Sequence, residues 1–74
     1  MKGSYGVVIF YSTSAALRAE SLAKRENLKI KLIPVPRHLS SDCGVCLRFE
    51  SEERATLQKI LQEGKVEYKD ICNL

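Results

Sequence analysis

The sequence predicts a small α+β fold in which four strands and two helices follow one another in the order β-α-β-β-α-β. Two stretches place apolar residues at helical spacing, and four short stretches are either continuously apolar or alternate between apolar and polar residues. With 74 residues, 45% of them hydrophobic and 28% charged, the chain has the composition of an ordinary folded domain. We therefore expect a single domain over residues 1–74, of a size at which a homodimer is a common source of extra stability.

The first half of the chain predicts a strand, a helix and a second strand. Residues 5–11 are rich in valine, isoleucine and aromatic side chains, which is typical of a buried central strand. Ser12 and the two hydroxyl residues after it can cap a helix, and apolar residues then recur at helical spacing through Asn27. Residues 29–33 alternate between polar and apolar, and the prolines that follow should end this second strand.

The second half predicts a strand, a helix and a last strand. Residues 45–50 alternate in the manner of a strand with one buried face, and Ser51 is expected to cap the next helix, which Gly64 should end. Residues 66–71 supply the last strand. We expect seven side chains to form the core: Leu22, Leu32, Leu47, Phe49, Leu57, Ile60 and Leu61. This order of elements fits the ferredoxin-like split-βαβ sandwich, with two helices on one face of a four-stranded antiparallel sheet.

The segment 34–49 is chemically the most distinctive part of the chain. It holds two of the three cysteines, the only histidine and two arginines. A thiol reacts as its thiolate, and nearby cations in an exposed loop favour that form. Cys43 is therefore the candidate nucleophile, although a cysteine that merely begins a strand would show the same pattern. In a reducing compartment, three cysteines are not expected to form a structural framework.

Several neighbours of Cys43 are candidates for binding an anion on its sulfur. Arg37 follows a rigid Pro-x-Pro approach, and His38 titrates near neutral pH, although a lone loop histidine is more often a solvated surface residue. Arg48 is a further cation, whereas Asp42 would oppose ionisation of the thiol. Gly44 would allow a partner to approach closely or the backbone to adopt a positive φ.

Two other chemistries use the same cysteines. The spacing of Cys43 and Cys46 is that of a dithiol motif, but such a motif normally opens a helix, and here a strand follows. If the strand began at Cys43, the two thiols would point to opposite faces of the sheet. A soft metal could take this pair together with His38 or Cys72, although a second paired motif is missing and no metal site is expected. A third alternative is an interaction module that docks through the loop without any chemistry.

Three motifs together carry a resemblance to a known family: the helix start over residues 12–20, the Pro-Val-Pro-Arg approach over 34–37, and Ser-Ser-Asp-Cys-Gly over 40–44. In these the chain resembles the bacterial putative selenium/sulfur (Se/S) carrier-like proteins. The resemblance implies a carrier, not a turnover enzyme, that holds sulfur or selenium on Cys43 as a persulfide or selenopersulfide and has no cofactor. It also implies a cysteine desulfurase-like or selenium-mobilising donor enzyme and an acceptor protein. Cys46 departs from the family pattern, which often has a small apolar residue there, and is a candidate resolving thiol.

The charge pattern argues against other functions. The net charge of +3 comes from basic and acidic residues that alternate along the chain, so we expect no nucleic-acid binding. No stretch is long enough to span a membrane, and the apolar run at residues 7–11 is shorter than the core of a signal peptide. A cytoplasmic protein of bacterial type is therefore expected.

Overall fold

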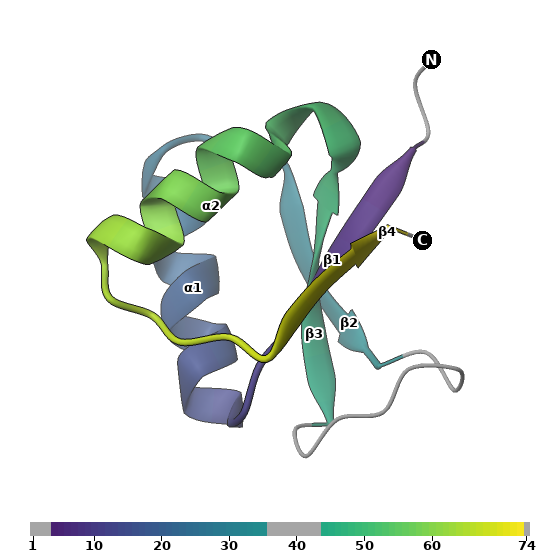
Figure 1. Ribbon diagram of the computed structural model, residues 1–74, viewed down its shortest axis with the longest axis vertical. Coiled ribbons are helices and arrows are strands. Elements are labelled where there is room, and N and C mark those ends of the chain that lie inside the picture. The colour runs from purple at the N-terminus through teal and green to yellow at the C-terminus, as the bar shows by residue number, and fades with distance from the viewer. Residues whose placement is uncertain (1–3, 36–43, 74) are drawn as a thin grey trace.

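The computed structural model describes residues 4–35 and 44–73, which form four strands and two α-helices (Figure 1). Their bounds are β1 (Tyr5–Ile9), α1 (Thr13–Arg25), β2 (Ile30–Pro34), β3 (Val45–Glu50), the 3-10 helix η1 (Ser51–Glu53), α2 (Arg54–Glu63) and β4 (Asp70–Asn73). All pairings in the sheet are antiparallel, in the order β2-β3-β1-β4. Both helices lie on the same side of this sheet (Figure 1). The predicted α+β fold with a ferredoxin-like arrangement is confirmed.

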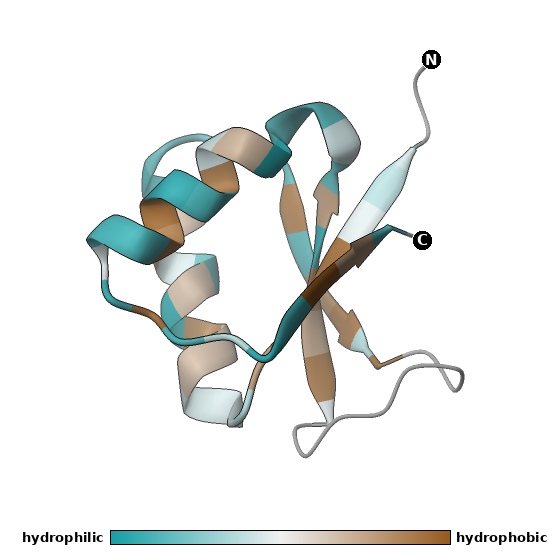
Figure 2. Ribbon diagram, viewed as in Figure 1, coloured by the Kyte–Doolittle hydropathy of each residue, from teal (hydrophilic) through white to brown (hydrophobic). Residues whose placement is uncertain are grey.

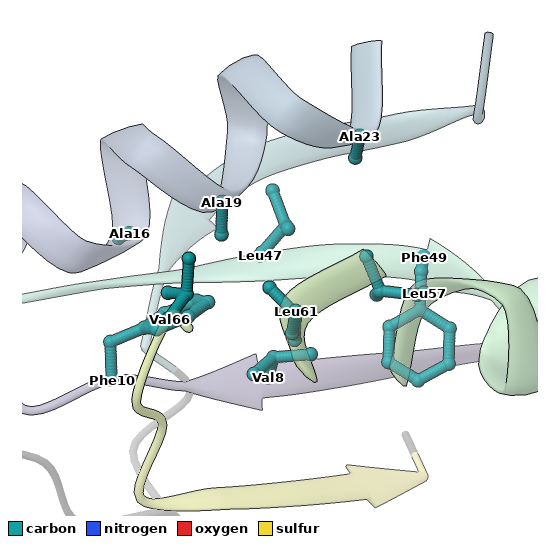
Figure 3. Packing of buried hydrophobic residues seen from close by; sticks show 10 residues of the cluster. All are labelled: Val8, Phe10, Ala16, Ala19, Ala23, Leu47, Phe49, Leu57, Leu61 and Val66. Carbon is teal, nitrogen blue, oxygen red and sulfur yellow. The ribbon is translucent and has the colours of Figure 1, made fainter. Parts of the chain in front are cut away.

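The main hydrophobic core fills the space between the sheet and the helices (Figure 3). Val8 of β1 and Leu47 and Phe49 of β3 contribute to it from the sheet, and three alanines bring α1 close to the strands. Figure 2 shows hydrophobic residues concentrated in the sheet, while both helices carry hydrophilic residues as well. This division is that of a two-layer structure with one buried stripe per helix.

Most of the predicted core is confirmed. Four of the seven side chains are fully buried, and Leu22 and Leu32 are partly buried and pack against the same cluster. Ile60 is the exception, because it is only half-buried and lines a hollow on the outside of the two helices. Leu57 and Leu61 are the α2 residues that are fully buried, and Ile60 lies one position, or about 100° of helix rotation, away from Leu61.

Of the two predicted helix caps, one is confirmed and the other is wrong. Ser12 caps α1 as expected, because its side-chain oxygen accepts a hydrogen bond from the amide of Ala15 at 3.2 Å. Ser51 does not cap α2. It opens η1, and no side chain caps either η1 or α2. A short 3-10 turn has replaced the capped first turn that the sequence suggested.

Gly64 ends α2 as predicted, but not for the expected reason. Its φ is −81°, which is right-handed, and the next residue, Lys65, adopts the left-handed φ of 56°. A Cβ on Gly64 would lie 2.5 Å from Cδ1 of Leu22. A side chain at this position would therefore require the end of the Leu22 side chain to shift, so glycine here suits the close packing of α1 against α2 and does not serve a left-handed turn.

The last strand begins later than predicted. Residues 66–69 are not strand, and β4 starts at Asp70. Val66 is buried in the main core, and the amide of Lys69 donates a hydrogen bond to the carbonyl oxygen of Ile9 at 2.6 Å. The apolar alternation over 66–68 thus reflects core contacts made while the chain crosses from α2 to the sheet edge. The first strand is also shorter than predicted, since Tyr11 lies beyond β1 and is 55% exposed.

Within residues 4–35 and 44–73, no helix is both long enough and apolar enough to cross a membrane.

Candidate functional site

One end of the sheet brings together segments that are far apart in the sequence. Ile9, the last residue of β1, pairs with Cys46 near the start of β3. The amide of Val35, just after β2, donates a hydrogen bond to the carbonyl oxygen of Gly44 at 3.3 Å. Because α1 follows β1 directly, its N-terminus lies at this end as well (Figure 1). We call this region, made of residues 11–14, Val35 and Gly44, the lower sheet end. The opposite end, where Tyr5 pairs with Glu50 and Gly6 pairs with Asn73, is the upper sheet end.

The predicted cargo-bearing residue, Cys43, lies outside the described residues, as do Arg37 and His38. The positions at which their segment joins the sheet are described. Val35 precedes the segment, Gly44 follows it, and the hydrogen bond between these two residues holds both attachment points at the lower sheet end. The sequence-predicted site is therefore connected to this end of the molecule.

Gly44 is exposed, and a Cβ built on it would meet no neighbour within 4 Å. Its φ is not in the left-handed range, so the expected positive φ is wrong. The chain around Gly44 thus has no steric need for glycine. What the structure shows is open space beside the residue that follows Cys43.

Cys46 lies in a different setting from the one the sequence suggested. It is the second residue of β3 and is fully buried, in a small apolar cluster with Val7 and Ile9 on the side of the sheet away from the helices. Its Sγ lies 4.0 Å from the carbonyl oxygen of Pro34. The alternating pattern predicted one buried face for β3, but both faces are buried where the strand begins. A buried thiol of this kind behaves as a small apolar side chain.

Cys72 shares that side of the sheet but is too far from Cys46 for a disulfide. Cys46 pairs with Ile9 and Cys72 pairs with Val7, so that β1 runs between them. Neighbouring strands are about 4.8 Å apart, which separates the two cysteine backbones by about 10 Å. A disulfide needs Cα atoms within roughly 7 Å. The two thiols therefore cannot be bridged in this fold.

The environment of Cys72 also makes it a weak nucleophile. Burial raises the pKa of its thiol, and the hydrogen bond and negative charge of Asp70 raise this pKa further, against a smaller opposite effect of Arg54. Since the thiolate is the reactive form, Cys72 is less ionised than an ordinary cysteine.

The N-terminus of α1 adds positive potential to the lower sheet end. No acidic residue lies in the first turn of α1, while Lys24 and Arg25 lie in its last turn. The partial positive charge of the helix dipole at the N-terminus therefore has no carboxylate of the first turn to balance it. From the sequence, Ser12 and its neighbours are predicted only as a helix cap. The missing acidic residue is the signal that could have indicated an electrostatic role.

The described part of the chain contains no group of three or more histidine, cysteine, aspartate or glutamate side chains that could hold a metal ion.

Comparison with known proteins identifies the family. The chain matched none of the curated proteins and none of the solved structures with which it was compared. One family model, described as "Putative Se/S carrier protein-like", matches residues 5–73. This match covers all the strands and helices of the fold and the segment that carries Cys43. The chain therefore belongs to the putative Se/S carrier protein-like family.

Proposed function

We propose that this protein carries sulfur or selenium on Cys43 as a persulfide or selenopersulfide and delivers it to an acceptor protein. The observation that carries the proposal is the family match over residues 5–73. Cys43 is the best-suited thiol because Cys46 is buried and the pKa of Cys72 is raised. The protein acts as a carrier that is loaded and unloaded by others, not as a turnover enzyme, and it uses no cofactor.

Loading is a thiol exchange that needs no added oxidant. The thiolate of Cys43 attacks the outer sulfur of a persulfide on a cysteine desulfurase-like donor, and a new S–S bond forms. The S–S bond of the donor breaks, and the donor cysteine leaves as a thiolate. Selenium follows the same exchange from a selenium-mobilising donor, with selenium in place of the outer sulfur. Delivery repeats the step with a thiolate of the acceptor as the attacking group.

The lower sheet end supplies features that suit this exchange. A loaded persulfide is more acidic than a thiol and carries negative charge, which the N-terminus of α1 favours because its first turn holds no acidic residue. Arg37 and His38 add cationic groups from the same segment as Cys43. The open space at Gly44 leaves room for a donor or acceptor to approach.

The burial of Cys46 bears on how the cargo is released. A resolving role would form a Cys43–Cys46 disulfide and release the cargo as sulfide or selenide, which requires the Cys46 thiol to reach Cys43. The Cys46 side chain is fully buried in this fold and is packed against Val7 and Ile9. This burial supports delivery by direct attack of an acceptor thiol.

The proposal is tested by loading single-thiol variants. A Cys46→Ala, Cys72→Ala double variant keeps only Cys43 and should gain one sulfur or selenium atom by exchange with a persulfide on a desulfurase or a selenopersulfide on a selenium-mobilising donor. Intact mass and peptide mapping report the adduct, which a reductant should remove. The matched variants that keep only Cys46 or only Cys72 should stay unloaded. An adduct on either of those cysteines, or none on Cys43, contradicts the proposal. The absence of an adduct on all three cysteines favours an interaction module, whose partner affinity would survive Cys43→Ser.

A further inference from the structure

A hollow of about 550 Å³ opens beside the N-terminus of α1, and its described lining is unusual in composition. It is lined by Tyr11, Val66, Glu67 and Tyr68. Tyr11 follows β1 at the lower sheet end, and the other three belong to the crossing from α2 to β4. Tyr11 is 55% exposed and is one of only two large hydrophobic side chains that stand so exposed in the described part of the chain.

The chemistry of this lining favours a cation. An aromatic face attracts an ammonium or guanidinium group, and two tyrosines beside a carboxylate combine this attraction with opposite charge. Glu67 is exposed, and no salt bridge within residues 4–35 and 44–73 engages it. The flanking Lys65 and Lys69 are exposed and oppose a cation, as does the partial positive charge at the N-terminus of α1, so the aromatic faces of Tyr11 and Tyr68 must supply most of the affinity.

The same chain already shows this pairing at the upper sheet end. The guanidinium carbon of Arg48 lies 4.4 Å from the centroid of the Tyr5 ring. Tyr5 is therefore occupied by a cation from its own sheet. Within the described residues, no cation of the chain is placed over Tyr11 or Tyr68 in this way.

We propose that the hollow of Tyr11, Glu67 and Tyr68 binds an arginine or lysine side chain of the protein that exchanges cargo with this carrier. This inference rests on the proposed function for the role of the partner, but the binding of the cation does not depend on it. The hollow and Gly44 lie at the same end of the sheet, because β1 leads into Tyr11 and β1 pairs with the start of β3. A partner held by a basic side chain here would present its reactive cysteine close to the attachment point of Cys43.

The test is an NMR titration of the full chain with Nα-acetyl-arginine amide at constant ionic strength. Nα-acetyl-citrulline amide, which has nearly the same shape without the charge, is the matched control ligand. The arginine compound should shift the amide signals of Tyr11 and residues 66–68 in a saturable way, and the citrulline compound should shift them much less. Equal shifts with both ligands, shifts located elsewhere, or no saturable shift would overturn the proposal.

Single-residue variants test which side chains of the hollow bind the arginine compound. Tyr11→Leu should weaken binding about fivefold, since it removes one aromatic face, while Tyr11→Phe should keep the affinity. Glu67→Gln should weaken binding about twofold, and Glu52→Gln, an exposed glutamate at the other end of the molecule, should change nothing. Cys43→Ser should bind the arginine compound normally. Loading of Cys43 without binding in the hollow contradicts this inference alone, whereas binding without loading contradicts the carrier proposal alone.

Discussion

The two ends of the sheet are held together in different ways. At the upper sheet end, side chains join separate elements: the carboxylate of Glu53 accepts hydrogen bonds from the amide of Lys29 at 3.1 and 3.4 Å, and Arg54 donates to Asn73 at 3.2 Å. Arg48 covers Tyr5 there as well. At the lower sheet end, main-chain hydrogen bonds connect the elements, while Tyr11 is exposed and the space at Gly44 is open.

This difference shows where the chain uses its polar and aromatic groups for its own stability. Contacts at the upper sheet end secure the strands against η1 and α2. At the lower sheet end comparable residue types are left accessible, which is what a surface for a partner requires. Three matched pairs of residues, one from each end, test this division, and a comparison of two thiols follows them.

The largest effect is expected for the glycine pair. At the upper sheet end, a Cβ on Gly6 would lie 2.5 Å from the Phe49 ring and 2.8 Å from the carbonyl oxygen of Cys72. Gly6→Ala should therefore lower the free energy of unfolding by about 1–3 kcal/mol, the usual cost of overpacking. Gly44→Ala should stay within about 0.5 kcal/mol of the parent chain, as open surface positions do. Urea unfolding measures both, and an equal loss for the two variants would refute the division.

The glutamate pair comes next. Glu53→Ala removes the acceptor of the Lys29 amide and should cost about 1 kcal/mol of unfolding free energy. Glu67→Ala at the hollow should leave stability unchanged, since no described hydrogen bond or salt bridge uses its side chain. The same urea experiment reports the difference. Finding that Glu67→Ala is the more harmful variant would show that the hollow is part of the structural framework.

A smaller effect is expected for the tyrosine pair. Tyr5→Leu removes the ring under Arg48 and should cost about 0.5–1 kcal/mol. Tyr11→Leu should be close to neutral in stability, because the Tyr11 ring is largely exposed. Thermal unfolding monitored by circular dichroism can compare the two. The comparison fails if Tyr11→Leu lowers the melting temperature more than Tyr5→Leu does.

The smallest effect on stability concerns the thiols. Cys72 pairs with Val7 in the middle of β1, and burial together with Asp70 raises the pKa of its thiol. Alkylation of Cys72 should therefore reach half its maximal rate at a higher pH in the folded chain than in the unfolded chain. Asp70→Asn should lower this pKa only in part, because burial is the larger cause.

The direction in which the stability of the fold changes with pH follows from the same raised pKa of Cys72. Since the folded pKa is above the unfolded pKa, the contribution of Cys72 to stability is fully present below the unfolded pKa and is lost as pH rises through the folded pKa.

Cys43 should alkylate faster than Cys72 at every pH in the double variants that keep one thiol each. The opposite order would remove the basis for choosing Cys43 as the carrier.

Much of the fold followed from local patterns. The helical spacing after Ser12 and the strict alternation over Val45–Glu50 identified α1 and β3 with little error, because each depends on contacts that repeat along the element itself. Residues 66–69 were mistaken for strand, since apolar alternation looks the same whether it serves pairing or core contact. Ser51 was mistaken for a cap because a 3-10 turn and a capped helix begin with similar residues.

The sequence by itself determined the order of the elements, the placement of both helices on one face of the sheet and the family resemblance, and it is the basis for proposing Cys43 as the carrier thiol. Only the tertiary structure decided that Cys46 is buried, that β1 separates it from Cys72, and that Gly64 lies directly against Leu22 of the other helix. It alone brought Tyr11 beside Tyr68. The physical reason is that secondary structure arises from periodic local patterns, whereas burial and reactivity depend on neighbours that are distant in the chain and meet only when it folds.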